Sequence, residues 1–145
     1  MDKIKSLLPM LIAHTAFKKN IETNLKKFGL NPGNPKVMLY IAEHEGCRQK
    51  DLAEAFYLET CTLSSVLSNM EDSGFIERRR HENDKRSYNI YTTTKGRQIL
   101  ETVRNQFEST IETALSGFSS EEAVLLHDYL DRVARNLKDA NSQLI

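Results

Sequence analysis

Two neighbouring stretches of this chain concentrate side chains that could bind a polyanion. The first offers short hydroxyl and amide groups, at Thr60, Thr62, Ser64, Ser65, Ser68 and Asn69. The second offers guanidinium and ammonium groups, at Arg78, Arg79, Arg80, Lys85 and Arg86. Hydroxyl and amide groups can bond to base edges in the major groove of DNA, and basic groups neutralise its phosphates. Duplex DNA is therefore the leading candidate ligand.

A helix from about residue 60 to residue 73 is expected to hold the hydroxyl groups. Its apolar residues recur at i, i+3, i+4 and i+7, at Leu63, Val66, Leu67 and Met70. Thr60 offers an N-cap oxygen, and Gly74 ends the pattern. On a helical wheel the outward face and its flanks then carry Cys61, Thr62, Ser64, Ser65, Ser68, Asn69 and Asp72. A shorter helix over residues 49–57, which includes Lys50, precedes it by a few residues, as in a helix-turn-helix.

A β-hairpin is expected to carry the basic groups. Residues 75–81 and 86–92 are rich in aromatic, β-branched and Arg residues, and the segment between them has turn composition. Because side chains alternate along a strand, Arg78 and Arg80 should share one face and Arg79 should take the other. The turn should bring Lys85 and Arg86 to the tip of the hairpin. A hairpin directly after a helix-turn-helix is typical of a winged helix.

Long amphipathic helices are expected on both sides of this lobe. Residues 2–28 carry an apolar stripe that ends at Gly29, a loop follows over residues 31–35, and a second helix runs from Pro35 to Glu45. A helix of about seven turns is expected after Thr93, and a capping box of Ser119 and Glu122 should start the last helix. These helices have more apolar surface than a winged-helix core needs, so we expect them to pack against each other and a second copy of the chain. The expected fold class is mainly α (α+β): a winged helix-turn-helix with a hairpin wing and long terminal dimerisation helices.

The overall composition restricts the possibilities further. The chain has 145 residues, 39% of them hydrophobic, and its 20 basic residues balance 20 acidic ones. Residues 76–86 nevertheless have a net charge of +2, and charge opposite a binding face is screened within about 8–10 Å. The sequence has no apolar run long enough to span a bilayer and only two cysteines, so we expect a cytoplasmic protein with reduced thiols and no membrane partner.

Four short motifs together resemble the MarR family of bacterial regulators. They are Gln49-Lys50-Asp51-Leu52-Ala53, Gly74-Phe75-Ile76-Glu77-Arg78, Asp84-Lys85-Arg86-Ser87 and Thr93-Thr94-Lys95-Gly96-Arg97. The resemblance implies one MarR-like domain over residues 1–145, a DNA-binding lobe at 35–92 and dimerisation helices at 1–30 and 96–145. It also implies a ligand-responsive repressor that binds a pseudo-palindromic operator as a homodimer. In such a protein Arg86 enters the minor groove, and Asp84 orients the arginines of the wing by a charge-assisted pair.

Two positions depart from the family pattern. Arg48 stands where the family often has a Ser or Thr that caps the helix, which leaves that helix start to water or to another cap. Ser65 replaces an Arg often found early in the recognition helix, so the obvious bidentate reader of guanine is missing.

The resemblance also implies a small aromatic or phenolic effector, in a pocket between the dimerisation helices and the DNA-binding lobe. His14, Phe17, Tyr40 and His44 are the candidate lining residues, although core packing is an alternative role for each of them. Cys61 is a candidate redox site, because the positive end of a helix dipole favours a thiolate. His44 and Cys47 are too few ligands for zinc, so we expect no metal and no cofactor.

The sequence also bears on two other functional classes, enzymes and protein-binding modules. The sequence has no phosphate-binding Gly-rich loop, no Gly-x-Ser-x-Gly and no His-Glu-x-x-His motif, so we do not expect an enzyme. A winged-helix module that binds another protein remains an alternative, because residues 48–75 have a net charge of −3.

Overall fold

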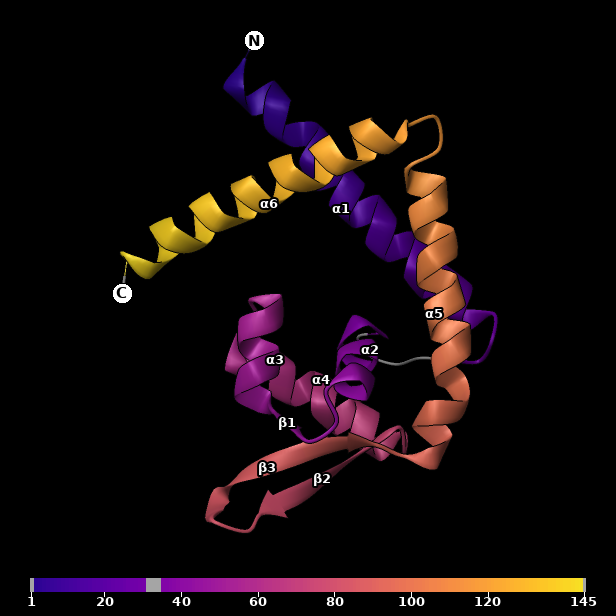
Figure 1. The fold of residues 1–145 in the computed structure, drawn as a ribbon, viewed down its shortest axis with the longest axis vertical. Helices are drawn as coiled ribbons and strands as arrows, with labels where there is room; N and C mark the ends of the chain where they lie inside the picture. The colour runs from indigo at the N-terminus through magenta and orange to yellow at the C-terminus, as the bar shows by residue number, and fades with distance from the viewer. Residues whose placement is uncertain (1, 31–34, 145) are drawn as a thin grey trace. The chain divides into compact units, whose positions relative to one another are not determined.

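The computed structural model describes residues 2–30 and 35–144, and residues 31–34 of the loop expected over residues 31–35 lie outside them. Contacts divide the chain into two units, Met1–Thr110 and Ile111–Ile145, which are described separately. The helices of the described residues are α1 (Lys3–Lys26), α2 (Pro35–Glu43), α3 (Gln49–Phe56), α4 (Thr60–Asp72), α5 (Thr94–Ala114) and α6 (Ser120–Ser142). The strands are β1 (Cys47–Arg48), β2 (Ile76–His81) and β3 (Asp84–Thr92) (Figure 1). This order confirms the expected winged helix-turn-helix fold class.

The wing is a three-stranded antiparallel sheet in the order β1-β3-β2. Ile76 pairs with Thr92 at the base of the hairpin, and His81 pairs with Asp84 at its tip. The pairing therefore continues to the two residues Glu82 and Asn83, and the turn is shorter than the four residues expected from composition. β1 joins the edge of β3, with Cys47 opposite Ile90.

One hydrophobic core in the first unit holds the lobe together. It contains side chains from α1, α2, α3, α4, the sheet and α5, and several of them have no exposed surface. The completely buried members include Val37, Met38, Ile41, Leu52, Leu63, Leu67, Met70 and Val103. Burial of a side chain of this size contributes about 1.5–3 kcal/mol, so the core fixes the angle between the short helices.

The helix starts confirm two of the predicted caps and correct a third. The Gly96 amide donates to Thr93 Oγ1 over 3.0 Å, and the Glu122 amide donates to Ser119 Oγ over 3.1 Å. Thr60, in contrast, is the first helical residue of α4, so the predicted N-cap there was wrong. Glu59 is the cap residue instead, because its backbone is extended while its carbonyl accepts the first bond of the helix, from the Leu63 amide.

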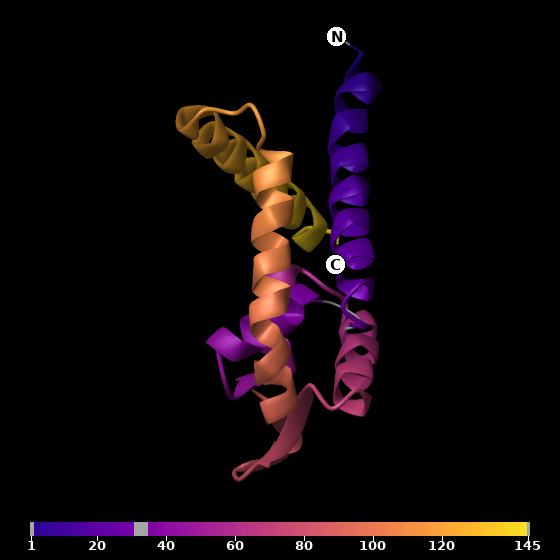
Figure 2. The same ribbon diagram turned by 90° about the vertical axis from the view of Figure 1, so that its right-hand side faces the viewer.

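The terminal helices expose apolar side chains. α1 continues through Pro9 as one helix (Figure 2). Its exposed apolar residues are Ile4, Leu7, Leu8, Leu11 and Ile12. In the second unit, α6 has no buried residue and exposes Val124, Leu125, Tyr129, Leu130, Val133 and Leu137. None of the helices in residues 2–30 and 35–144 is long and apolar enough to cross a membrane.

Candidate nucleic-acid interface

Helix α4 presents the predicted polar face on the side away from the core. Leu63, Leu67 and Met70 are completely buried, which turns the opposite side outward. The exposed polar residues are Thr60, Thr62, Ser65 and Asn69, and the half-buried ones are Ser64 and Ser68. Short side chains of this kind allow a helix to approach base edges closely in a major groove.

Ser64 has a structural partner that the sequence did not reveal. Its hydroxyl accepts a 2.8 Å hydrogen bond from Gln49 Nε2, and the same amide nitrogen lies 3.4 Å from the Thr60 carbonyl oxygen. Gln49 is the first residue of α3, so this bond joins the two helices of the helix-turn-helix. The Ser64 hydroxyl therefore helps to set their mutual orientation in addition to any contact with a base.

The turn between these helices contains an unusual backbone conformation. Tyr57 follows α3 with φ of 51° and ψ of 50°, in the left-handed region that residues other than glycine rarely adopt. Its amide donates to the Ala53 carbonyl, which ends α3 one residue earlier than expected. The reversal lets the chain enter α4 after Leu58 and Glu59.

Arg78 connects the wing to the recognition helix. Its Nε and Nη2 donate to the two carboxylate oxygens of Glu71, over 3.2 and 3.1 Å. These hydrogen bonds hold the pKa of Glu71 below its usual value and raise the pKa of Arg78. Glu71 lies in the last turn of α4 and Arg78 in β2, so the pair fixes the hairpin against the helix. The Arg78 charge is thus already matched within the lobe.

The next two arginines point to opposite faces of the hairpin. Arg79 pairs with Glu77, and its guanidinium lies 4.3 Å from the centre of the Tyr91 ring. The Arg80 guanidinium lies 5.9 Å from the centre of the Tyr88 ring. Because Tyr88 and Tyr91 are three positions apart in β3, these contacts confirm the predicted alternation.

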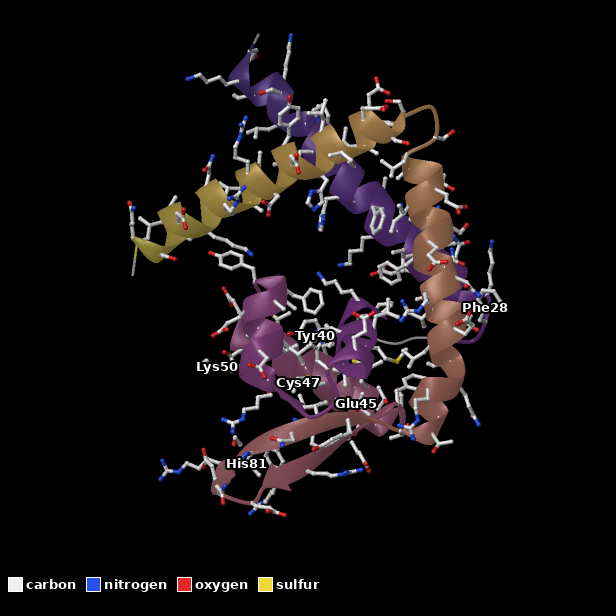
Figure 3. All side chains as sticks on the ribbon, viewed as in Figure 1. Phe28, Tyr40, Glu45, Cys47, Lys50 and His81 are labelled. Atoms are coloured by element: carbon white, nitrogen blue, oxygen red, sulfur yellow. The ribbon has the colours of Figure 1, made fainter. Side chains whose placement is uncertain are left out.

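Arg86 is exposed near the tip of the wing, where a side chain can reach a neighbouring groove. Asp84 Oδ1 accepts a 2.9 Å hydrogen bond from the Arg86 backbone amide, so the contact seen shapes the turn and does not engage the guanidinium. His81 lies close to this turn (Figure 3), and its Nδ1 accepts from the Asn83 amide over 3.2 Å. The Lys85 side chain lies outside the described part of the structure.

Lys50 and Arg48 stand at the start of α3, and both are exposed. The Arg48 backbone amide donates to Asp51 Oδ2 over 2.8 Å, so an acid three residues ahead satisfies the helix start. Asp51 thus satisfies the Arg48 amide, while the Arg48 side chain makes no cap hydrogen bond to α3. A groove between this helix start and the wing is lined by Arg48, Gln49, Lys50, Arg78, Arg86 and residues of β3.

The four candidate effector residues do not gather at one place. Tyr40 stacks on His44 with 4.1 Å between ring centres, and the edge of Phe56 meets Tyr40. Phe17 instead packs against Phe107 of α5, and His14 is exposed on α1. A recess lined by Tyr40, His44, Glu45, Cys47, Asp51 and Glu54 opens where α2, β1 and α3 meet (Figure 3).

The two cysteines differ in accessibility. Cys61 is exposed in the first turn of α4, and its thiol donates to Glu59 Oε2 over 3.7 Å. Cys47 is buried in β1, and burial raises its pKa to about 11. In the described part of the chain, no three His, Cys, Asp or Glu side chains form a group that could hold a metal ion.

Comparison with known proteins decides the family. The MarR family model matches residues 30–88. A Bacillus subtilis (strain 168) protein named uncharacterized HTH-type transcriptional regulator YybA is 32% identical over 119 residues, which cover 82% of this chain and 78% of that protein. This chain belongs to the MarR family. It is a transcriptional regulator, as the sequence predicted, and not an enzyme.

Solved structures of similar proteins include complexes with DNA. A MarR family regulator from Listeria monocytogenes, complexed with a 26mer DNA, is 25% identical with a TM-score of 0.86 over 92% of this chain and 89% of that one. The S. aureus MepR-DNA complex is 27% identical with a TM-score of 0.80, over 92% of this MarR-family chain and 97% of MepR.

Proposed function

We propose that this MarR-family regulator binds a specific duplex as a homodimer and acts as a repressor. The two α4 helices enter successive major grooves of a pseudo-palindromic operator, and Arg86 reaches the minor groove beside each of them. The outward polar face of α4 carries this proposal, because Gln49, which lines a basic groove of the same lobe, donates a hydrogen bond to Ser64 of α4. The DNA complexes of the Listeria and S. aureus proteins support it by similarity.

The terminal helices support the dimeric part of the proposal. Exposed apolar side chains are spaced along α1 and again along α6, whereas a stable monomer would cover most of such stripes. A second copy of the chain is the natural partner, since a two-fold interface uses the same patch on both subunits. Sedimentation equilibrium should give twice the chain mass of 16.6 kDa, and a monomer at micromolar concentration would refute this part.

Selection of fragments from genomic DNA by the purified full chain tests DNA recognition directly. The bound fragments should share a pseudo-palindromic element whose half-sites lie about one helical turn apart. Ser65→Ala and Asn69→Ala should alter the preferred bases, whereas Arg86→Ala should weaken binding of all sequences. Lys19→Ala on α1 is the control that should leave both properties unchanged. Capture of no duplex would favour the alternative, a winged-helix module that binds a protein.

The ligand-responsive part rests on the aromatic recess at the end of α2. The stacked rings of Tyr40 and His44 offer a flat surface suited to a small aromatic or phenolic compound. Salicylate should release the operator from the native protein more readily than from Tyr40→Ala. His14→Ala serves as the control, because His14 is exposed on α1 and does not line the recess. Equal release from the native protein and Tyr40→Ala would refute this site.

Cys61 supports a second way to control the same surface. Its thiol is exposed among the groups proposed to face the bases, so an oxidised sulfur would keep α4 out of the major groove of the DNA. Peroxide should then abolish operator binding by the native protein and spare Cys61→Ser. Equal loss in the two proteins would reject the redox mechanism and leave DNA recognition unaffected.

A further inference from the structure

The groove between the start of α3 and the wing is strongly basic. Its lining includes Arg48, Lys50, Arg78 and Arg86, with Ser87 and Tyr88 of β3, and no carboxylate. Arg78 is matched by Glu71. Arg48, Lys50 and Arg86 form no ion pair with any residue among those described. Three uncompensated cations around one groove favour an anionic ligand.

Asp51, three residues after Arg48, does not line this groove. Its carboxylate accepts the Arg48 backbone amide, and it lines the recess beside Tyr40 and not the basic groove. This arrangement separates the two ends of Arg48: the backbone forms the helix cap while the side chain remains available. The departure from a Ser or Thr cap therefore places a cation at the start of α3, where Asp51 accepts the Arg48 amide.

The backbone of Arg48 is held on two sides. Arg48 pairs with Asn89 of β3 as the second residue of β1, and it is also the cap residue of α3. Cys47 points into the core, so alternation along the strand turns Arg48 outward. A guanidinium on a fixed backbone loses less entropy when it binds than one on a loop.

We propose that this groove binds the phosphodiester backbone of duplex DNA and that Arg48 is a phosphate contact additional to α4 and the wing tip. The inference rests on the proposed function. Arg86 connects this groove with the tip of the wing, because it lines the groove and also lies near the tip. A strand whose bases face α4 would bring its sugar-phosphate chain past the start of α3. Arg48 thus fixes the position of the duplex and does not read its sequence.

The salt dependence of operator binding measures this contact. Each phosphate contact contributes a slope of about 0.9 to log K against log salt concentration. Because the proposed homodimer carries two copies of Arg48, Arg48→Ala should reduce the slope by about 1.8 and weaken binding about 25- to 100-fold at 50 mM salt. Arg48→Lys should restore most of the slope, since an ammonium also releases a counterion. The order of preference among operator variants should stay the same in both proteins.

Arg79→Ala is the matched control. Arg79 belongs to the same three-stranded sheet as Arg48, but it is paired with Glu77 and covers Tyr91 on the opposite face, so its loss should change the slope little. Circular dichroism should give similar thermal unfolding for native protein and Arg48→Ala, because the helix cap uses only the backbone of Arg48. A slope of Arg48→Ala equal to the native slope would overturn the inference while the proposed function stands. Absence of salt-dependent binding by the native protein would overturn both.

A small polyphosphate presents the same anionic phosphate oxygens as the backbone of DNA. Sodium pyrophosphate and sodium chloride should have equal effects on operator binding at matched ionic strength if the groove is a phosphodiester site. Release of DNA by pyrophosphate from the native protein, but not from Arg48→Ala, would assign the groove to a free anion and overturn the inference.

Discussion

Replacement of Gly96 by alanine should destabilise the fold, although helix propensity predicts the opposite. Gly96 is buried in the first turn of α5, beside the chain that enters β2. A Cβ at this position would lie 2.1 Å from the Phe75 carbonyl oxygen, whereas such contacts do not come closer than 3.0 Å. The start of α5 must therefore move by about 1 Å, because the obstructing atom belongs to the backbone.

The size of the effect follows from the contacts at this junction. Alanine gains about 1 kcal/mol over glycine inside a helix. Relief of the clash costs about 1–3 kcal/mol. The movement also weakens two hydrogen bonds, from the Thr93 amide to Phe75 O and from Thr93 Oγ1 to Gly74 O, which contribute about 1 kcal/mol each. The net loss should be about 2–4 kcal/mol.

Urea unfolding followed by circular dichroism gives the measurement. All proteins must be compared at one concentration, since association adds to apparent stability. Gly29→Ala is the control: Gly29 has a φ of +69° but nothing within 4 Å of its added Cβ, so only the backbone cost of about 1–2 kcal/mol remains. A Gly96→Ala protein as stable as the native one, or more stable, would refute the steric argument.

Two further predictions concern the lobe. A double-mutant cycle with Glu71→Gln and Arg78→Met should give a coupling of about 1 kcal/mol in urea unfolding, a modest value because both side chains are partly exposed. Since Arg78 lowers the pKa of Glu71, this coupling should be present at neutral pH and be lost as the pH falls through the lowered pKa; a coupling that persists in acid would contradict it. At pH 8 iodoacetamide should label Cys61 and spare Cys47, whose pKa of about 11 leaves about one thiol in a thousand ionised, and equal labelling in a peptide map would contradict this.

Local patterns predicted the elements well because their causes are local. The apolar spacing of residues 63–70 places the buried side of α4, and the capping box of Ser119 and Glu122 starts α6. The N-cap of α4 was misplaced at Thr60, one residue after the true cap Glu59, because the chain reverses direction at the left-handed turn of Tyr57. That turn depends on how α3 and α4 pack, and composition does not encode it.

The candidate interface was predictable only in part. A helical wheel separates the exposed and buried sides of α4 without any knowledge of tertiary structure. A helical wheel does not give the hydrogen-bond partners of individual residues. Gln49 bonds to Ser64 across 15 positions, and Arg78 bonds to Glu71 from another element. Sequence could suggest Arg78 as a free cation, but only the folded lobe shows that its charge is already matched.

The distribution of acids also bears on the choice between DNA and protein as the ligand of this lobe. Residues 48–75 have a net charge of −3, which by itself disfavours a phosphate-binding surface. In the folded lobe, however, Asp51 accepts a hydrogen bond from the Arg48 amide and Glu71 accepts hydrogen bonds from Arg78. Two of these carboxylates therefore have partners within the lobe. Neither of these two lines the basic groove. A sum of charge along the sequence therefore does not describe the surroundings of this groove, which is lined by four basic side chains and no carboxylate.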